Sequence, residues 1–286
     1  MKNYLSLIPI SARVHRRQNR MTLLCIIFSV FLVTTIFSMA DMVIREEKNR
    51  LINRHGDWHI KLEHISDSEA EEIGRRPEVS VVSWYDVLNA DTEQNYKIGE
   101  EKAILCGTDE AYIAKIWNGW EEGTYPQKEG EVMLSPNAKK DLGVETGDCI
   151  TVKTPGGSMD YTITGFGGDD VDYNEQYDAV SVFMTRTAFG KLFDMNSKSD
   201  AAPVYYVQFK EHTNISKILK ELKKQYGWTE KNISENTAVL GVTGFSSNST
   251  MLNIYLIAVV LFVLILIAGV LMISGSMNSN VAQRTK

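Results

Sequence analysis

The sequence predicts a membrane protein in which two transmembrane α-helices flank an extracytoplasmic α+β domain. Two long apolar segments without charge lie near the two ends of the 286-residue chain. Charge is distributed unevenly: residues 1–40 carry +5, residues 41–250 carry −13 and residues 251–286 carry +2. The long acidic middle alternates between strand-like and helix-like patterns, which is typical of a folded domain. A nucleic-acid binder would need a basic domain surface, so we expect no nucleic-acid partner.

The first predicted span is the uncharged segment 21–40, which ends at Asp41. Twenty helical residues rise about 30 Å, close to the thickness of the hydrocarbon core of a bilayer. The alternative is a cleaved signal peptide, because Ser38-Met39-Ala40 resembles a cleavage site. The apolar stretch and the basic region before it are both longer than in a usual signal peptide, so a retained span is favoured.

The second predicted span is residues 251–276, with its most apolar part at 254–273. No charged residue occurs between Glu235 and Arg284. A helix that is apolar all round has no polar face to turn to water, which argues against a core helix of a soluble domain. Backbone groups in lipid must be bonded internally, so both segments are predicted to be helical.

Basic residues next to the spans predict the orientation. A cluster of arginines precedes the first span, and two basic residues follow the second; by the positive-inside rule both termini are cytoplasmic. Residues 1–20 are then a cytoplasmic amphipathic basic helix, 41–250 the extracytoplasmic domain and 277–286 a cytoplasmic end. The arginine cluster sets topology and could also contact anionic lipid headgroups; it consists of Arg13, Arg16, Arg17 and Arg20.

Two β-α units are expected to bracket the extracytoplasmic domain. The first has a strand at 58–62, a helix that starts at the Ser66-x-x-Glu69 capping pattern, and a strand at 79–87. The second has a strand at 203–209 and an amphipathic helix at 214–226. Between them, about 100–200, we expect a β-rich insertion. Its strands are predicted at 102–106, 131–134, 148–153, 160–166 and 177–184, with helices at 136–141 and 185–193.

Three stretches carry a resemblance to a known family. Residues 11–33 resemble a basic elbow helix that runs into a first membrane helix. Residues 130–166, GEVMLSPNAKKDLGVETGDCITVKTPGGSMDYTITGF, are similar to an extracytoplasmic pattern of "gEv-ls", "lG-GD-v" and "y-v-G". Residues 273–286, ISGSMNSNVAQRTK, resemble the end of a second membrane helix followed by an "RT-K" turn. The family with these features is the FtsX-like permeases, the membrane subunits of MacB-type ABC transporters.

This resemblance implies a permease subunit in a bacterial cell membrane, with a MacB-like periplasmic core domain. Its implied partners are a separate ABC ATPase chain, a second permease copy or half, and membrane lipids. Such permeases handle peptides, lipoproteins, antibiotics or the control of cell-wall hydrolases. Family members continue past the "RT-K" turn with further membrane helices, so we expect this chain to be an N-terminal part of a permease.

The rival hypothesis is a two-span membrane sensor, such as the input module of a histidine kinase or a chemoreceptor. It has the same topology, with a ligand-binding domain between two spans. Further hydrophobic spans after the second helix would favour the permease, whereas heptads leading into a kinase core would favour the sensor.

No enzyme site is evident in the sequence. None of the glycines forms the G-x-x-x-x-G-K-[ST] loop that cradles nucleotide phosphates, so any ATPase activity is expected in another chain. Residues 169–174, DDVDYN, lack the glycine and the final glutamate of a calcium loop and are interpreted as a solvated acidic loop. His55, His59 and His64 have no nearby cysteine to complete a zinc site. We therefore expect no catalytic residue, metal or cofactor.

The environment of the three cysteines and of one pair of hydroxyl residues is considered next. Cys25 lies in the first span and is expected to pack as a small hydrophobe. Whether Cys106 and Cys149 form a disulfide stays open, because sequence spacing does not give their separation in space. Thr34 and Ser38 share one face of the first span, where backbone bonding to the preceding turn is favoured over contact with a neighbouring helix. Residues 236–250 are uncharged and could form a linker or a docking surface.

Overall fold

The computed structural model describes residues 16–89, 95–168, 178–196, 203–211, 213–243 and 250–284. It divides into two compact units, one formed by residues 1–47 and 249–286 and the other by residues 48–248. The acidic segment 169–174 and Arg13, both considered above, lie outside the described residues.

The first unit contains two long helices, α2 (Arg16–His55) and α9 (Thr250–Arg284). The last two turns of α2 belong to the second unit. Each is long and apolar enough to cross a membrane, over residues 20–55 and 253–271. Their apolar side chains are outward-facing: Phe28 is 62% exposed and Leu271 67%. Helix α2 runs without interruption through both the predicted span and the charged segment that follows it. Helices that face lipid expose apolar side chains, as α2 and α9 do.

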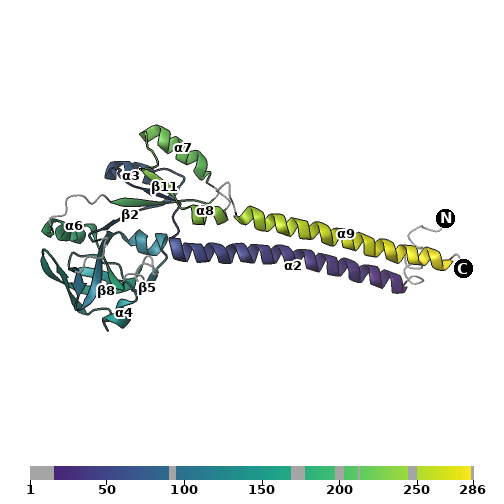
Figure 1. Cartoon of the computed structure of the whole chain (residues 1–286), viewed down its shortest axis with the longest axis horizontal. Helices are drawn as coiled ribbons and strands as arrows, with labels where there is room; N and C mark the ends of the chain where they lie inside the picture. Colours follow the sequence, from purple (N-terminus) through teal and green to yellow (C-terminus); the bar gives the residue numbers. More distant parts are fainter. Residues whose placement is uncertain are drawn as a thin grey trace, which may run out of the picture. The chain divides into compact units, whose positions relative to one another are not determined.

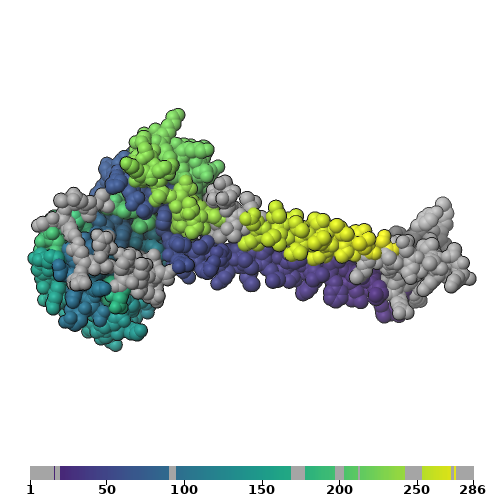
Figure 2. Space-filling model, viewed as in Figure 1, coloured from purple at the N-terminus to yellow at the C-terminus, as the bar shows by residue number. Residues whose placement is uncertain are grey.

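The two helices lie side by side and antiparallel within this unit (Figures 1 and 2). The rings of Phe37 and Phe262 are 6.1 Å apart, and a Cβ atom added at Gly269 would lie 3.3 Å from the Ser29 hydroxyl. Small residues at such a crossing let helix backbones approach closely. The Thr34 hydroxyl donates to the carbonyl oxygen of Val30 at 3.0 Å, so for Thr34 the prediction of bonding within the helix is confirmed.

In the described residues, the second unit is built on one continuous sheet of eleven strands. Its open half has the order β11-β1-β10-β2, with each neighbouring pair antiparallel. This half consists of β1 (Ile60–Leu62), α3 (Asp67–Gly74), β2 (Val79–Val87), β10 (Val204–Phe209), α7 (Ile215–Tyr226) and β11 (Ile233–Glu235). Strand order and connections are those of a split β-α-β sandwich, with a long insertion between β2 and β10.

Helices α3 and α7 cover one face of this open half. Ile218 and Leu222 of α7 are buried, and they belong to the same cluster as Leu62 and Val207 of the sheet. Sequence periodicity explains this burial, because apolar residues recur every three or four positions in α7 and every second position in β10. Helix α3 begins with the predicted capping box, in which Ser66 accepts from the Glu69 amide and Glu69 accepts from the Ser66 amide.

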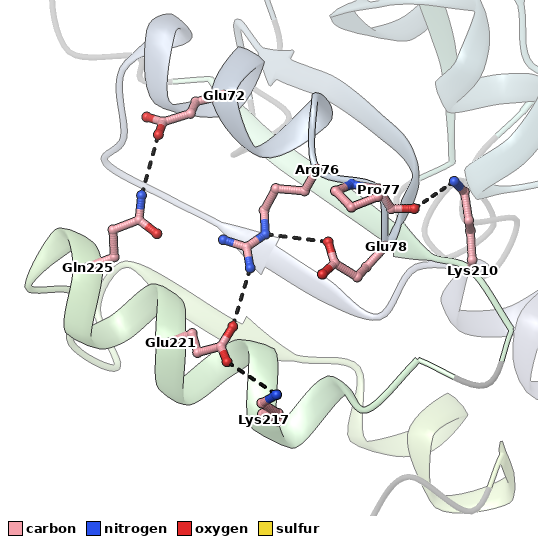
Figure 3. A network of polar contacts seen from close by, with 8 residues as sticks. All are labelled: Glu72, Arg76, Pro77, Glu78, Lys210, Lys217, Glu221 and Gln225. Atoms are coloured by element: carbon pink, nitrogen blue, oxygen red, sulfur yellow. Dashed lines mark hydrogen bonds and ion pairs between the residues drawn. The ribbon is translucent and has the colours of Figure 1, made fainter.

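A polar network connects α3 and the turn that follows it to α7 (Figure 3). The guanidinium of Arg76 lies 3.4 Å from the Glu221 carboxylate and 3.8 Å from that of Glu78. The Gln225 amide donates to Glu72 at 3.4 Å. Arg76 is 22% exposed at its side chain, so these contacts are less screened by solvent than a fully exposed ion pair would be.

The other half of the sheet closes on itself as a six-stranded barrel. Going round, the strands are β4, β3, β7, β8, β6 and β9, and β9 returns to pair with β4. Pairs β4–β9 and β6–β8 are parallel, and the remaining pairs of the barrel are antiparallel. The bounds are β3 (Lys97–Ile98), β4 (Glu101–Thr108), β6 (Glu131–Leu134), β7 (Cys149–Thr154), β8 (Gly157–Gly167) and β9 (Ala179–Met184).

Strands β4 and β9 are buried on both faces, which explains their nearly continuous apolar sequences. Leu105 and Val182 point into the barrel core, whereas Cys106 and Phe183 belong to a second cluster on the outside. That outer cluster includes the π-helix η2 (Tyr112–Ile116), and its Tyr112 ring stacks on Tyr85 at 4.8 Å. The barrel and the open half are therefore joined by a shared aromatic layer.

Short elements complete the domain. They are β5 (Trp120–Gly123), which pairs with β8, α4 (Ala138–Asp141), α6 (Arg186–Met195) and α8 (Thr237–Thr243). Helix α8 shows that residues 237–243 of the segment 236–250, for which a linker and a docking surface were both open, are helical.

A candidate coupling joint where the chain enters and leaves the domain

Helix α2 ends at the junction between its charged segment and the first strand of the domain. Gly56 follows its last residue with φ of +79°, and a Cβ atom there would lie 2.8 Å from the Trp58 ring. Only glycine adopts this backbone without strain, which is why it ends the helix. The turn is fixed by the Trp58 indole, which donates to the His55 carbonyl oxygen at 2.6 Å.

Asp57 anchors the chain directly after this turn. Its backbone amide donates to the Ile116 carbonyl oxygen at 2.5 Å. The Gln208 side chain donates to both the Asp57 carbonyl oxygen, at 2.9 Å, and the Asp57 carboxylate, at 2.8 Å. Burial raises the pKa of Asp57, while the charge of Lys48 and the Gln208 hydrogen bond oppose that rise. Helix η2 and strand β10 thus hold the end of α2 from two sides.

Asn236 connects this entry point to the segment that leaves the domain. Its side-chain amide donates to the Gly56 carbonyl oxygen at 3.2 Å, and its backbone amide donates to His59 at 3.0 Å. Its side-chain oxygen accepts from the Val239 amide at 3.3 Å and so caps α8. Asn236 is only 4% exposed. We call the set Gly56, Asp57, Gln208 and Asn236 the joint.

His59 is a buried acceptor beside the joint. Its Nδ1 accepts from the Phe209 amide at 2.8 Å, and the ring is 9% exposed. Burial, helped by the charge of Lys48, lowers the pKa of His59 to about 4. The imidazole is therefore neutral in the folded protein over the physiological pH range.

This neutral histidine predicts a pH dependence of stability. As the pH falls from about 6.5 to about 4, the unfolded chain binds the His59 proton before the folded chain does, so stability decreases by about 3 kcal/mol. We expect His59→Gln, which keeps an acceptor, to flatten this part of the curve, measured as chemical unfolding at pH 7.5 and pH 4.5. His64→Asn is the control, because that side chain is exposed. An unchanged pH dependence in His59→Gln would contradict the assignment.

A second polar cluster links the open half to the barrel half. Arg186 at the start of α6 pairs with Asp67 at the start of α3 at 2.7 Å, and its guanidinium lies 5.1 Å from the Trp84 ring centre. The Tyr205 hydroxyl also bonds Asp67. That bond and Arg186 lower the pKa of Asp67. These side chains line a cavity of about 210 Å³.

The sites weighed from the sequence are placed as follows. His55, His59 and His64 do not converge, and among the described residues no group of three or more His, Cys, Asp or Glu side chains could hold a metal ion. Cys106 and Cys149 are not joined by a disulfide; the first is buried and the second is exposed. Arg16 and Arg20 are exposed on the first turns of α2, and Arg17 lies in the same helix.

The joint was not predicted from the sequence. Asn236 lies in the segment 236–250, for which the sequence leaves a linker or a docking surface open, although an asparagine before Thr-Ala-Val-Leu is a possible helix N-cap signal. Asp57 and Gln208 are 151 residues apart, and nothing local in either neighbourhood indicates their contact.

Comparison with known proteins gives the family. The sequence profile of the MacB-like periplasmic core domain matches residues 21–225. No curated protein sequence matches the chain. Among solved structures, the periplasmic region of MacB from Actinobacillus actinomycetemcomitans is similar over 64% of this chain and 89% of its own, with 13% identity and a TM-score of 0.42.

A domain of a putative permease from Porphyromonas gingivalis is similar over 62% of this chain and 87% of its own, with 12% identity and a TM-score of 0.40. The profile match covers well over half of the chain and includes Gly56, Asp57 and Gln208 of the joint. It gives no support to the two-span sensor. The chain therefore belongs to the MacB-like periplasmic core domain family of ABC transporter permeases.

Proposed function

We propose that the chain is a permease subunit that couples ATP hydrolysis by a separate ATPase chain to movement of its membrane helices and its domain. The family implies an ABC ATPase partner. The observation that carries the proposal is the joint, where Asn236 binds the end of α2 and caps the helix that leads toward α9. Asn236 thus bonds both the segment that enters the domain and the segment that leaves it.

The proposed cargo is a peptide, lipoprotein or antibiotic for export, or a signal that controls cell-wall hydrolases. We further propose that the chain pairs with a second permease copy or half and contacts membrane lipids. In the proposed topology residues 1–20 and 277–286 are cytoplasmic, residues 21–40 and 251–276 span the membrane and residues 41–250 are extracytoplasmic. Arg13, Arg16, Arg17 and Arg20 would set this orientation.

Cysteine labelling tests the topology. Cys149 is a free, exposed thiol, so in cells with an intact inner membrane it is expected to react with a membrane-impermeant maleimide. The Cys149→Ser variant should lose this label, and Arg16→Cys in that background should label only after permeabilisation. If Arg16→Cys reacted with the maleimide without permeabilisation, and Cys149 of the parent did not, the orientation would be the opposite of the one proposed.

Reconstitution tests the coupling. The full chain is expected to show no ATPase activity alone, and to co-purify with an ABC ATPase whose turnover changes when the two are reconstituted in lipid nanodiscs. The matched variant is Asn236→Asp, which keeps the cap on α8 but removes the donor to Gly56. Coupling through the joint would be refuted if the ATPase had the same turnover alone, with the parent chain and with the Asn236→Asp variant.

A further inference from the structure

A polar cavity of about 580 Å³ lies beside the joint, between the last two turns of α2 and the domain. This volume falls within the range of about 300–1,000 Å³ that small-ligand pockets have. Most ligand pockets are lined mainly by apolar side chains, whereas this one is lined mainly by polar ones. Its walls are formed by Asn49, Ile52, Asn53, Asp57, Ala114, Lys115, Asn118 and Gln208.

Four of the lining side chains are carboxamides. Asn49 and Asn53 are one helical turn apart on α2, so they lie on the same face. Asn118 follows η2 with φ of +49°, and Gln208 comes from β10. A carboxamide offers one acceptor and two donor hydrogens, which matches the C=O and N–H of a peptide main chain.

Two charged groups complete the cavity. The Asp57 carboxylate is held in place by Gln208, and Lys115 extends from η2 with an exposed side chain. One acid and one base in the same cavity disfavour a simple anion or cation and favour a ligand that carries both charges or neither. Among the described residues, the lining contains no aromatic ring and so no apolar flat surface that could cover the face of a sugar.

We propose that this cavity binds a short peptide segment through its main chain, and that binding joins the end of α2 to η2 and β10. The peptide amides bond the carboxamides of Asn49, Asn53 and Asn118. A free peptide would also place its ammonium group at Asp57 and its carboxylate at Lys115. An internal segment of a partner protein would use the carboxamides alone.

Two probes distinguish these sources. Triglycine has both charged termini, whereas N-acetyl-triglycine N-methylamide has neither. Each is titrated into the full chain in lipid nanodiscs, and binding is followed by hydrogen exchange of residues 48–57 and 112–118. Protection by triglycine alone indicates a free peptide, and equal protection by both indicates an internal segment. Protection by neither, or stronger protection by the disaccharide trehalose, overturns the proposal.

Variants test whether the protection from hydrogen exchange comes from binding in this cavity. We expect Asn53→Leu to weaken binding about tenfold, the cost of losing one or two hydrogen bonds. Because Asn53 is exposed on α2, this change should leave the fold intact, checked by unchanged exchange in β4 and β9. Gln225→Leu removes a carboxamide from the exposed face of α7 and should leave binding unchanged. Equal binding by Asn53→Leu and the parent would also overturn the proposal.

Discussion

Asn236→Asp is expected to lower the free energy of opening of the joint by about 2–3 kcal/mol. The carboxylate keeps an oxygen that accepts from the Val239 amide and caps α8, but it has no hydrogen to donate to the Gly56 carbonyl oxygen. At 4% exposure, a lost donor leaves a buried carbonyl group without that bond and brings a charge into the interior. Hydrogen exchange of residues 56–59 and 236–240 in the full chain measures the effect.

Asn214→Asp is the matched control. Asn214 caps α7 through its side-chain oxygen, which accepts from the Lys217 amide at 3.0 Å, and it is exposed. Aspartate is as good a cap as asparagine, so this change is expected to cost less than about 0.5 kcal/mol. If the two substitutions had equal effects, Asn236 would be a helix cap only and the joint would not exist as described.

Leu222→Asp is expected to destabilise the open half of the domain by at least about 4 kcal/mol. Leu222 has no exposed surface and lies in the cluster between α7 and the sheet. The substitution removes buried apolar volume and introduces a carboxyl group among apolar side chains. Urea unfolding of the full chain in detergent, followed by tryptophan fluorescence, should show an earlier transition, because Trp228 belongs to the same cluster.

Lys220→Asp provides the comparison, because it places the same residue on the exposed face of the same helix. Its effect is expected to stay within about 0.5–1 kcal/mol, as for surface substitutions. A similar loss in both variants would show that helix propensity or charge, and not burial, determines the stability of α7.

The local elements of the domain follow from the sequence more directly than their assembly does. Strand β6 was predicted at 131–134 and observed there, and α7 lies within one residue of its predicted start, because each has a clear periodicity and clear end signals. The barrel was not predicted. It is closed by the parallel pairing of β4 with β9, in which Lys102 lies opposite Ala179, and no local signal specifies a contact between such distant segments.

The continuous apolar sequence of β9 does not by itself show where the strand lies in the sheet. Val180 and Val182 face the barrel core, and Phe183 faces the aromatic layer, so the strand has no polar face. Such a run is compatible with any strand that is buried on both sides. The joint is more difficult to predict from the sequence than the barrel, because Asn236 and Gly56 are 180 residues apart and polar residues carry no periodic signal.

The most direct test of the account measures the joint while a partner ATPase changes its nucleotide state. The full chain is reconstituted in nanodiscs with the proposed ABC ATPase partner, and hydrogen exchange of residues 52–59 and 233–240 is compared between ADP and a non-hydrolysable ATP analogue. Because Asn236 holds both segments, the account predicts that their exchange changes together, and that Asn236→Asp uncouples them. Exchange that stays constant in both segments, or changes in only one, would contradict it.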